Sequence, residues 1–352
     1  SNSRVLEWAS SSNPAKYSLE TGFVIIFFQI IGLHKMKIIQ VTPSGQKSNS
    51  GNGVTARRWT HIFCNLGHKV TNVTEYDGQS ADMMVAIHAW RSAKEIEYFK
   101  KLYPDRPLVV CLAGTDINEY IYSHPKVTIR SLELADVLVC LHDLVKNITP
   151  RHLRHKLQVI YQSAKPLYGP RKPSIRNFDI CVVGNLRKVK DPMRAALAAR
   201  IVPAESRIRI IHFGRAYNQT MADNAIAEMS RNPRYIWKGE VPRWRVRQEL
   251  KKTRLMILSS KAEGGANVIS EAVVAGVPVV ASKIDGNVGL LERSYCGYYP
   301  LGDTLALRDA MLKAETNSAH VDKLTAQCQT LALKFTIKEE QARWHKLFSG
   351  IN

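Results

Sequence analysis

Short apolar runs of strand length recur along this chain in two series, and this alternation constrains the fold more than any other feature. Helix-like stretches separate the runs, which is typical of parallel sheets covered by helices. The first series comprises Ile38–Val41, Lys69–Val73, Met83–Ile87, Leu108–Leu112, Val137–Leu141 and Gln158–Tyr161. The second comprises Phe178–Val183, Ile208–Phe213, Tyr235–Trp237, Leu255–Leu258, Val277–Ala281 and Gly297–Tyr299. The pattern predicts an α/β protein with two Rossmann-like, doubly wound domains that face each other across a cleft.

A proline-rich segment separates the two series. Residues 166–173 contain three prolines and a glycine, which interrupt regular structure and mark a linker. Because 352 residues suffice for two cores, we expect a first domain over residues 36–168 and a second over residues 169–335. The remaining residues, 336–352, contain an amphipathic pattern from Thr336 to Phe348, and we expect this helix to cross back to the first domain.

Residues 1–35 precede the first strand-like run and are expected to be an extension outside the core. The stretch from Met36 to Val41 has the character of a domain start. The apolar segment Gly22–Leu33 is only about a dozen residues long, whereas about 20 are needed to span a bilayer. It has no basic segment before it, so a signal peptide is not expected. An interfacial membrane anchor is the alternative interpretation.

The formal net charge of +20, with a pI near 9.8, predicts a protein that attracts anions. The basic residues are dispersed in pairs such as Arg57-Arg58 and Lys251-Lys252, without a basic arm or an RNA-binding aromatic signature. Nucleic acid is one possible partner of such a protein, and small phosphorylated substrates, the expected partners, explain the charge as well. The six cysteines form no Cys-x-x-Cys pair, which favours neither a zinc site nor a disulfide framework and fits a reducing cytoplasm.

Two glutamates, Glu263 and Glu271, bracket a glycine turn and the start of a predicted helix. The strand-like run Leu255–Leu258 precedes them, and Val268–Ala275 has helical character. A glycine loop that leads into a helix offers free N–H groups and the positive end of the helix dipole, which suits a diphosphate. The plainer interpretation is an ordinary strand-to-helix turn with two solvated glutamates.

The longer stretch Ser259–Ser282, together with Gly239-Glu-Val241, resembles the carboxyl-terminal domain of family-four glycosyltransferases, which have the GT-B fold. The resemblance implies that Glu271 holds the ribose hydroxyls of a UDP-sugar and that Glu263 faces the donor sugar as a catalytic residue. It also implies that Gly264, Gly265, Ala266 and Asn267 approach the donor, and that Lys190 binds the diphosphate. The arginine usual in the family is Asn185 here, so Arg187 is expected to replace it.

Segments of the first half resemble the selenosugar synthases of selenoneine biosynthesis. These segments are Ile39–Ser44, Ser50–Trp59, Ala86–Ser92, Leu112–Asp116, Ser131–Asp136 and Tyr161–Pro166. The resemblance implies that a UDP-sugar, such as UDP-N-acetylglucosamine or UDP-glucose, reacts with selenophosphate. A 1-selenosugar, UDP and phosphate are the implied products. The enzymes of this fold usually need no metal, and no Asp-x-Asp motif is present, so no cofactor is expected.

Selenophosphate is a small anion, and several predicted strand and helix ends of the first domain suit it. A small-residue loop at the head of a helix is a ready anion site. The expected acceptor residues are Ser50, Gly51, Asn52, Gly53, Thr55, Arg57, Arg58, Arg91, Thr115 and Asp116. We expect Arg91 and one of Arg57 and Arg58 to bind phosphate, because a guanidinium presents a planar fork. Arg91 and His88 are the expected catalytic residues on this side.

Some alternatives remain open at this point. His88 is either a proton shuttle or a structural histidine after a strand. The Gly-Thr-Asp116 sequence also fits a helix N-cap, and Asp285–Gly289 is interpreted as a loop near the sugar or uracil. The acceptor is selenophosphate or an alcohol on a lipid or polysaccharide, and an inactive, nucleic-acid-binding relative is a third hypothesis.

Overall fold

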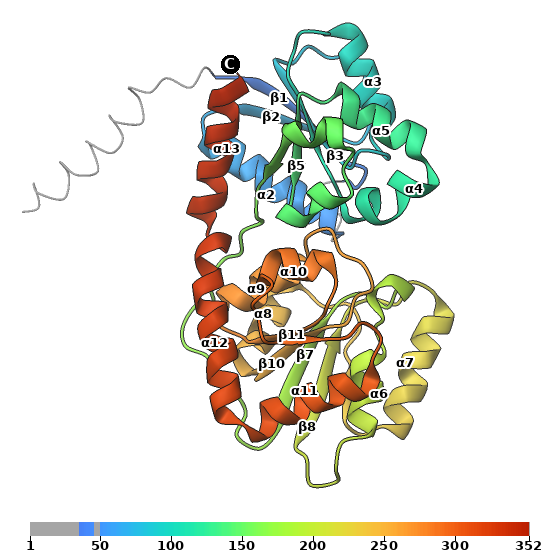
Figure 1. Cartoon of the computed structure of the whole chain (residues 1–352), viewed down its shortest axis with the longest axis vertical. Coiled ribbons are helices and arrows are strands. Elements are labelled where there is room, and N and C mark those ends of the chain that lie inside the picture. Colours follow the sequence, from blue (N-terminus) through green and yellow to red (C-terminus); the bar gives the residue numbers. More distant parts are fainter. Residues whose placement is uncertain (1–34, 46–49, 352) are drawn as a thin grey trace, which may run out of the picture.

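The computed structural model describes residues 35–45 and 50–351 and contains two parallel six-stranded sheets, each covered by helices (Figure 1). This architecture confirms the predicted α/β class with two Rossmann-like sheets. The predicted extension, residues 1–35, lies outside the described residues except for Lys35. None of the helices among the described residues is long and apolar enough to cross a membrane.

The first sheet has the strand order β2-β1-β3-β4-β5-β6. Apolar side chains on its two faces form separate clusters, one around Phe99 and Leu138 and one around Trp59 and Phe63. Its strands are β1 (Lys37–Val41), β2 (Lys69–Val73), β3 (Met83–Ile87), β4 (Leu108–Cys111), β5 (Val137–Cys140) and β6 (Leu157–Val159). The helices beside them are α2 (Gly51–Asn65), α3 (Ala93–Leu102), α4 (Ile121–Ser123) and α5 (Pro125–Leu134), with the short turns η1 (Asp116–Tyr120), η2 (Asp143–Asn147) and η3 (Arg151–Lys156).

The second sheet has the strand order β12-β11-β10-β7-β8-β9. Its strands are β7 (Phe178–Val183), β8 (Ile208–Phe213), β9 (Tyr235–Trp237), β10 (Leu255–Leu258), β11 (Val279–Ser282) and β12 (Tyr298–Tyr299). Its helices are α6 (Arg194–Arg200), α7 (Gln219–Arg231), α8 (Arg243–Lys252), α9 (Asn267–Val274), α10 (Asp285–Leu291), α11 (Thr304–Thr316) and α12 (Ser318–Ala332), with the short turns η4 (Lys188–Lys190) and η5 (Leu333–Phe335). Strands β10, β7 and β8 are buried along most of their length, as expected for a sheet covered on both faces.

Helix α13 (Ile337–Ile351) follows α12 along one side of the molecule and packs on the first sheet (Figure 1). Its buried Trp344 meets the Trp59 ring edge-on, with 4.8 Å between the ring centroids, and Phe348 meets Phe63 at 5.0 Å. The chain therefore passes between the two sheets twice, once through residues 160–177 and once between η5 and α13.

The predicted loop at Asp285–Gly289 is wrong, because these residues form the first part of α10. Two glycines in five residues lower helix propensity, and the sequence therefore predicts a loop here. Both glycines are needed for packing instead. A Cβ on Gly286 would lie 2.3 Å from the carbonyl oxygen of Glu263, and one on Gly289 would lie 2.5 Å from Nδ1 of His142 in the first domain. Burial at this contact lowers the pKa of His142.

The strand ends also differ slightly from the prediction. Strand β6 ends at Val159 rather than at Tyr161, and β11 begins at Val279 rather than at Val277. The residues Ser50–Thr55, expected as a loop, are the cap and the first turn of α2, since the Ser50 side chain accepts a hydrogen bond from the N–H of Gly53.

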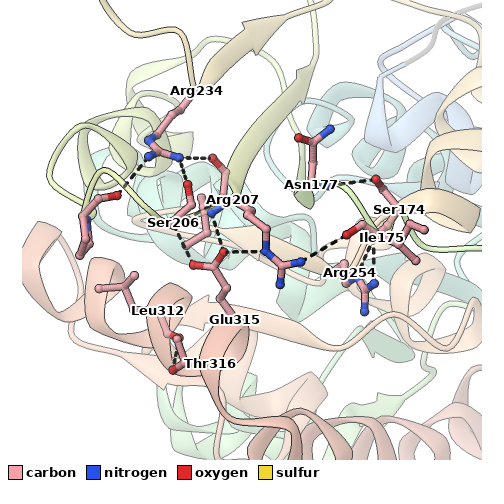
Figure 2. A network of polar contacts seen from close by, with 12 residues as sticks. Ser174, Ile175, Asn177, Ser206, Arg207, Arg234, Arg254, Leu312, Glu315 and Thr316 are labelled. Carbon is pink, nitrogen blue, oxygen red and sulfur yellow. Dashed lines mark hydrogen bonds and ion pairs between the residues drawn. The ribbon is translucent and has the colours of Figure 1, made fainter.

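A polar network fixes the linker where it enters the second domain, at the amino-terminal edge of the second sheet (Figure 2). The Glu315 carboxylate accepts hydrogen bonds from the Ser206 hydroxyl, at 2.7 Å, and from the N–H of Arg207, at 2.6 Å. The Arg207 guanidinium donates to the carbonyl of Ile175, and that of Arg254 donates to Ser174. These contacts hold the end of the linker against the amino-terminal ends of the strands, so the linker does not cover the carboxyl ends of the strands.

Glu228 should make the stability of the second domain depend on pH. Its carboxylate is buried and accepts hydrogen bonds from Arg200, Asn232 and Arg231, and the Arg200 hydrogen bond is the main reason that the pKa of Glu228 falls to about 2. A lowered pKa stabilises the fold at pH values above the ordinary value of 4.5, and this stabilisation is lost as the pH falls towards 2. We expect Glu228→Gln to lose about 3 kcal/mol of unfolding free energy at pH 7.

Denaturant unfolding of Glu228→Gln and wild type between pH 7 and pH 2.5 measures this effect. The difference between the two proteins should shrink as the pH falls below 4.5. Glu97→Gln is the matched control, because Glu97 is exposed on α3 and its loss should leave the unfolding free energy nearly unchanged. A difference that stays constant over the whole pH range would contradict the assignment.

Candidate active site

A cavity of about 680 Å³ lies between the two domains, where the carboxyl ends of their strands face each other. This is the place where open α/β sheets usually bind ligands. From the first domain, the predicted residues on its walls are Ser50, Gly51, Asn52, Thr55, His88, Arg91 and Thr115. From the second domain they are Arg187, Lys190, Glu263, Gly264, Gly265 and Asn267. The predicted residues that do not line it are Gly53, Arg57, Arg58, Asp116, Ala266 and Glu271.

Glu263 and Lys190 form an ion pair on the wall of the second domain. The Lys190 ammonium lies 2.5 Å from Oε1 of Glu263, and the Ser260 hydroxyl donates to the same oxygen at 2.5 Å. The Ser259 hydroxyl donates to the carbonyls of Lys190 and Asp191, which fixes the turn η4 beside β10. A positive charge is therefore held in place next to the glycine loop, in a position to meet a negatively charged ligand.

At the glycine loop, Gly264-Gly265, the two domains approach each other closely. A Cβ on Gly264 would lie 2.3 Å from Cα of Gly114, and one on Gly265 would lie 2.4 Å from Cβ of Leu141. Gly265 also has a φ of +142°, which favours glycine. The Asn118 side chain donates across the gap to the carbonyl of Glu263 at 3.2 Å. The absence of side chains at these glycines lets the two domains approach this closely.

Glu271 lies on α9, outside the cavity wall, and its carboxylate pairs with the Arg243 guanidinium at the start of α8. The side chain of Glu271 is 19% exposed. The pairing partner was not anticipated from the sequence.

Other residues on the wall of the second domain were also not anticipated. Arg215 and Glu240 follow the carboxyl ends of β8 and β9, which is a signal that could have been used. The Arg215 N–H donates to Oδ1 of Asn185 at 3.1 Å, and the Arg187 guanidinium lies 5.6 Å from the centre of the Tyr217 ring. Arginines 187 and 215 therefore add positive charge to the same wall as Lys190.

On the side of the first domain, α2 points its amino terminus into the cavity, since Ser50, Gly51 and Asn52 all line it. The N–H groups of a first helical turn have no carbonyl to bond within the helix, and together with the dipole they favour an anion. Arg91, which lines the same cavity, adds a full positive charge. The Thr55 hydroxyl is engaged, because it donates to the carbonyl of Gly51 and accepts from Gln162.

Arg58 lies behind this helix end in a network that joins both domains. Its guanidinium donates to Glu340 on α13, to the carbonyl of Ser163 and, at 3.0 Å, to Oδ1 of Asn267 at the start of α9. The Glu340 carboxylate is fully buried and also accepts from Trp59 and Ser163. The structure thus places Arg58 at the contact between the domains and Asn267 at both this contact and the cavity.

His88 follows β3 and lies between Asp116 and Thr115. Its Nδ1 is 2.7 Å from Oδ1 of Asp116, and its Nε2 is 2.8 Å from the Thr115 hydroxyl. Both His88 and Asp116 are only 1% exposed, whereas Thr115 is partly exposed at the cavity wall. Asp116 therefore contacts His88 rather than the open cavity, and its side chain caps no helical N–H.

Comparison with known proteins finds a family model that matches part of the chain. Residues 171–329 match the family model described as Glycosyl transferases group 1. The chain is also 23% identical, over 279 residues, to Glycosyltransferase 1 domain-containing protein 1 of Xenopus tropicalis, which covers 71% of this chain and 80% of that protein.

Two solved structures share the fold of both domains. The complex of Anabaena HepE with UDP-glucose superimposes with a TM-score of 0.69 at 16% identity and covers 90% of this chain and 100% of that one. Sucrose-phosphate synthase from Thermosynechococcus elongatus superimposes with a TM-score of 0.75 at 13% identity and covers 90% of this chain and 99% of that one. The predicted GT-B fold is confirmed.

Proposed function

We propose that this chain, whose residues 171–329 match the family model of the group 1 glycosyl transferases, transfers a glycosyl group from a UDP-sugar to selenophosphate. The products are a 1-selenosugar, UDP and phosphate, which is the selenosugar-forming step of selenoneine biosynthesis. The expected donors are UDP-N-acetylglucosamine and UDP-glucose. One observation carries the proposal: a single cavity joins a lysine and carboxylate pair beside a glycine loop with a helix amino terminus and an arginine from the facing domain.

The wall of the second domain suits the donor. Lys190, Arg187 and Arg215 supply the positive charge that a diphosphate needs as a leaving group, and such preorganised charge stabilises a transition state. Glu263 can accept hydrogen bonds from sugar hydroxyls, and charge-assisted bonds of this kind are stronger than neutral ones. The Anabaena HepE structures contain UDP, glucose or UDP-glucose, which supports the donor class.

The wall of the first domain suits a small acceptor anion. The amino terminus of α2 and Arg91 provide hydrogen-bond donors for phosphate oxygens. The close approach of Gly114 to Gly264 leaves little room for a large acceptor beside the glycine loop. Selenium of selenophosphate is a strong nucleophile in its ionised form, so the transfer step depends mainly on positioning and charge neutralisation. We expect the reaction to need no metal.

The test is an anaerobic incubation of the full chain with a UDP-sugar and selenophosphate, in which UDP release is followed and the selenosugar is sought by mass spectrometry. We expect UDP and the selenosugar to form together, with and without a metal chelator. Orthophosphate in place of selenophosphate is the control. UDP release that requires a lipid or polysaccharide alcohol, and not selenophosphate, would establish the alternative acceptor class and overturn the proposal.

Arg91→Ala should raise KM for selenophosphate by about tenfold to a hundredfold, because a hydrogen bond to a charged group contributes about 1.5–3 kcal/mol. The KM for the UDP-sugar should change little, since the donor lies on the opposite wall. Steady-state kinetics with each substrate varied in turn measures the two effects. Arg130→Ala, on the exposed face of α5, removes the same charge outside the cavity and should leave both KM values unchanged. A larger change in the donor KM than in the acceptor KM would contradict the placement.

A further inference from the structure

His88 is held in a backbone conformation that residues other than glycine rarely adopt. Its φ is +84°, in the left-handed region that non-glycine residues seldom occupy. Strain of this kind persists only where the surroundings enforce it, and it concentrates at functional sites. Here the N–H of His88 donates to the carbonyl of Cys111 at 2.9 Å, which ties the residue to the end of β4. The strained conformation directs the buried imidazole toward Asp116 and Thr115.

Asp116 fixes the orientation and the tautomer of His88. Its carboxylate accepts hydrogen bonds from the N–H groups of Ala89, Trp90 and Ala113, at 2.8, 2.9 and 2.9 Å. These three donors fix the position of the carboxylate. Nδ1 of His88 is closer to the Asp116 oxygen, at 2.7 Å, than to the N–H of Arg91, at 3.2 Å. From these distances we assign the proton to Nδ1, which leaves Nε2 to accept the proton of the Thr115 hydroxyl.

Thr115 is the most exposed member of this group, and Thr115 and His88 both line the cavity. Thr115 lies between Gly114, which contacts the glycine loop at Gly264, and the π-helical turn η1. The π-helical turn is a rare conformation that is found mostly at functional sites. Arg91 lines the same cavity. The order of hydrogen bonds, from carboxylate to imidazole to hydroxyl, is that of a relay that withdraws a proton from whatever the hydroxyl contacts.

The proposed transfer step does not need this relay. An ionised selenium nucleophile brings no proton that must be removed when the carbon–selenium bond forms. Release of phosphate is different, because the first product would carry the phosphoryl group on selenium. Cleavage of that phosphorus–selenium bond consumes one water molecule, and a water nucleophile gains most from a proton acceptor.

We propose that Thr115, His88 and Asp116 form a second catalytic device that hydrolyses the phosphorus–selenium bond of the glycosylated intermediate in the same cavity. This inference rests on the proposed function. The water oxygen attacks phosphorus, and the phosphorus–selenium bond breaks with its electron pair on selenium, which leaves as the sugar selenolate. The water proton passes to the Thr115 oxygen while the Thr115 proton passes to Nε2 of His88. Arg91 and the α2 amino terminus hold the phosphate oxygens, and Asp116 acts as a positioning residue beside the imidazolium.

The test compares the rates of UDP release and phosphate release in one reaction mixture. In Thr115→Val, a variant of the same shape without the hydroxyl, phosphate release should fall about a hundredfold while UDP release falls much less. The intermediate, a sugar with a phosphoryl group on selenium, should accumulate and be visible by phosphorus NMR. Thr115→Ser restores the hydroxyl and should restore phosphate release.

His88→Asn provides an independent variant, because asparagine tolerates the left-handed backbone conformation. It should uncouple the two releases as Thr115→Val does. Equal loss of UDP and phosphate release in both variants, or phosphate release unchanged in both, would overturn the inference. The proposed function fails in a distinguishable way: wild type would then release no UDP with selenophosphate. The melting temperatures of both variants are compared with wild type, so that unfolding is not mistaken for uncoupling.

Discussion

Replacing Gly264 by alanine is expected to lower kcat/KM by at least about a hundredfold. The new methyl group would meet Cα and N of Gly114 at 2.3 and 2.4 Å, and both of these are backbone atoms that cannot rotate away. The two domains must then separate by about 1 Å or more at the glycine loop. A displacement of about 1 Å in a catalytic site costs about 10²-fold in rate.

Gly264→Ala should disturb the approach of the two domains but neither UDP binding nor the stability of the fold. UDP is expected to lie on the second domain, so its affinity, measured by calorimetry, should change only a few-fold. The melting temperature should change little, because the Gly114 contact lies between the domains and not inside a core. Gly350→Ala is the control, since a Cβ at Gly350 meets no other atom within 4 Å. Wild-type turnover in Gly264→Ala would show that the domains need not approach this closely.

Removing the positive charge of Lys190 is expected to lower kcat by about 10²–10³-fold. The ammonium is held 2.5 Å from Glu263 at the cavity wall. In the proposed reaction, charge develops there on the departing diphosphate. Loss of one preorganised donor to a developing charge typically has an effect of this size. Because the interaction strengthens in the transition state, kcat should fall more than the KM for the UDP-sugar rises.

Steady-state kinetics of Lys190→Ala with saturating selenophosphate measures this effect. Lys188→Ala removes the same charge two residues away, from an exposed side chain that does not line the cavity, and should behave as wild type. If both variants lost activity equally, the general positive field of the protein would be responsible, and the specific role of Lys190 would be refuted. A higher KM with unchanged kcat would indicate ground-state binding only.

Local patterns in the sequence were sufficient to predict the sheets. Strands β7, β8, β9 and β10 have the predicted bounds, because buried parallel strands are short apolar runs that end at polar or glycine residues. The helix α10 was missed because its two glycines are explained by contacts with Glu263 and His142, residues far away in the sequence. Contacts of this kind leave no local signal.

In the candidate site, too, some residue positions could be predicted from local sequence patterns, whereas others depend on contacts between residues far apart in the sequence. His88, which directly follows β3, could be placed at the cavity from the order of the strands, whereas Lys190 was placed there by the family resemblance. The positions of Arg58 and Asp116 could not, because their side chains are directed by distant partners. Arg58 is turned toward Glu340, which is 282 residues later, and Asp116 is surrounded by N–H groups of the loop that follows β3. The relay through Thr115 follows from that arrangement and not from a motif.

The packing of α13 on the first sheet has a consequence for protein synthesis. Trp344, Leu347 and Phe348 belong to the same apolar cluster as Trp59 and Phe63. The first sheet can therefore not acquire its full core until residues 337–351 have left the ribosome, whereas the second sheet draws on earlier residues only. Although its strands are translated before those of the second sheet, the first domain is completed after the second, and until then the apolar face around Trp59 and Phe63 lacks the cover that α13 provides.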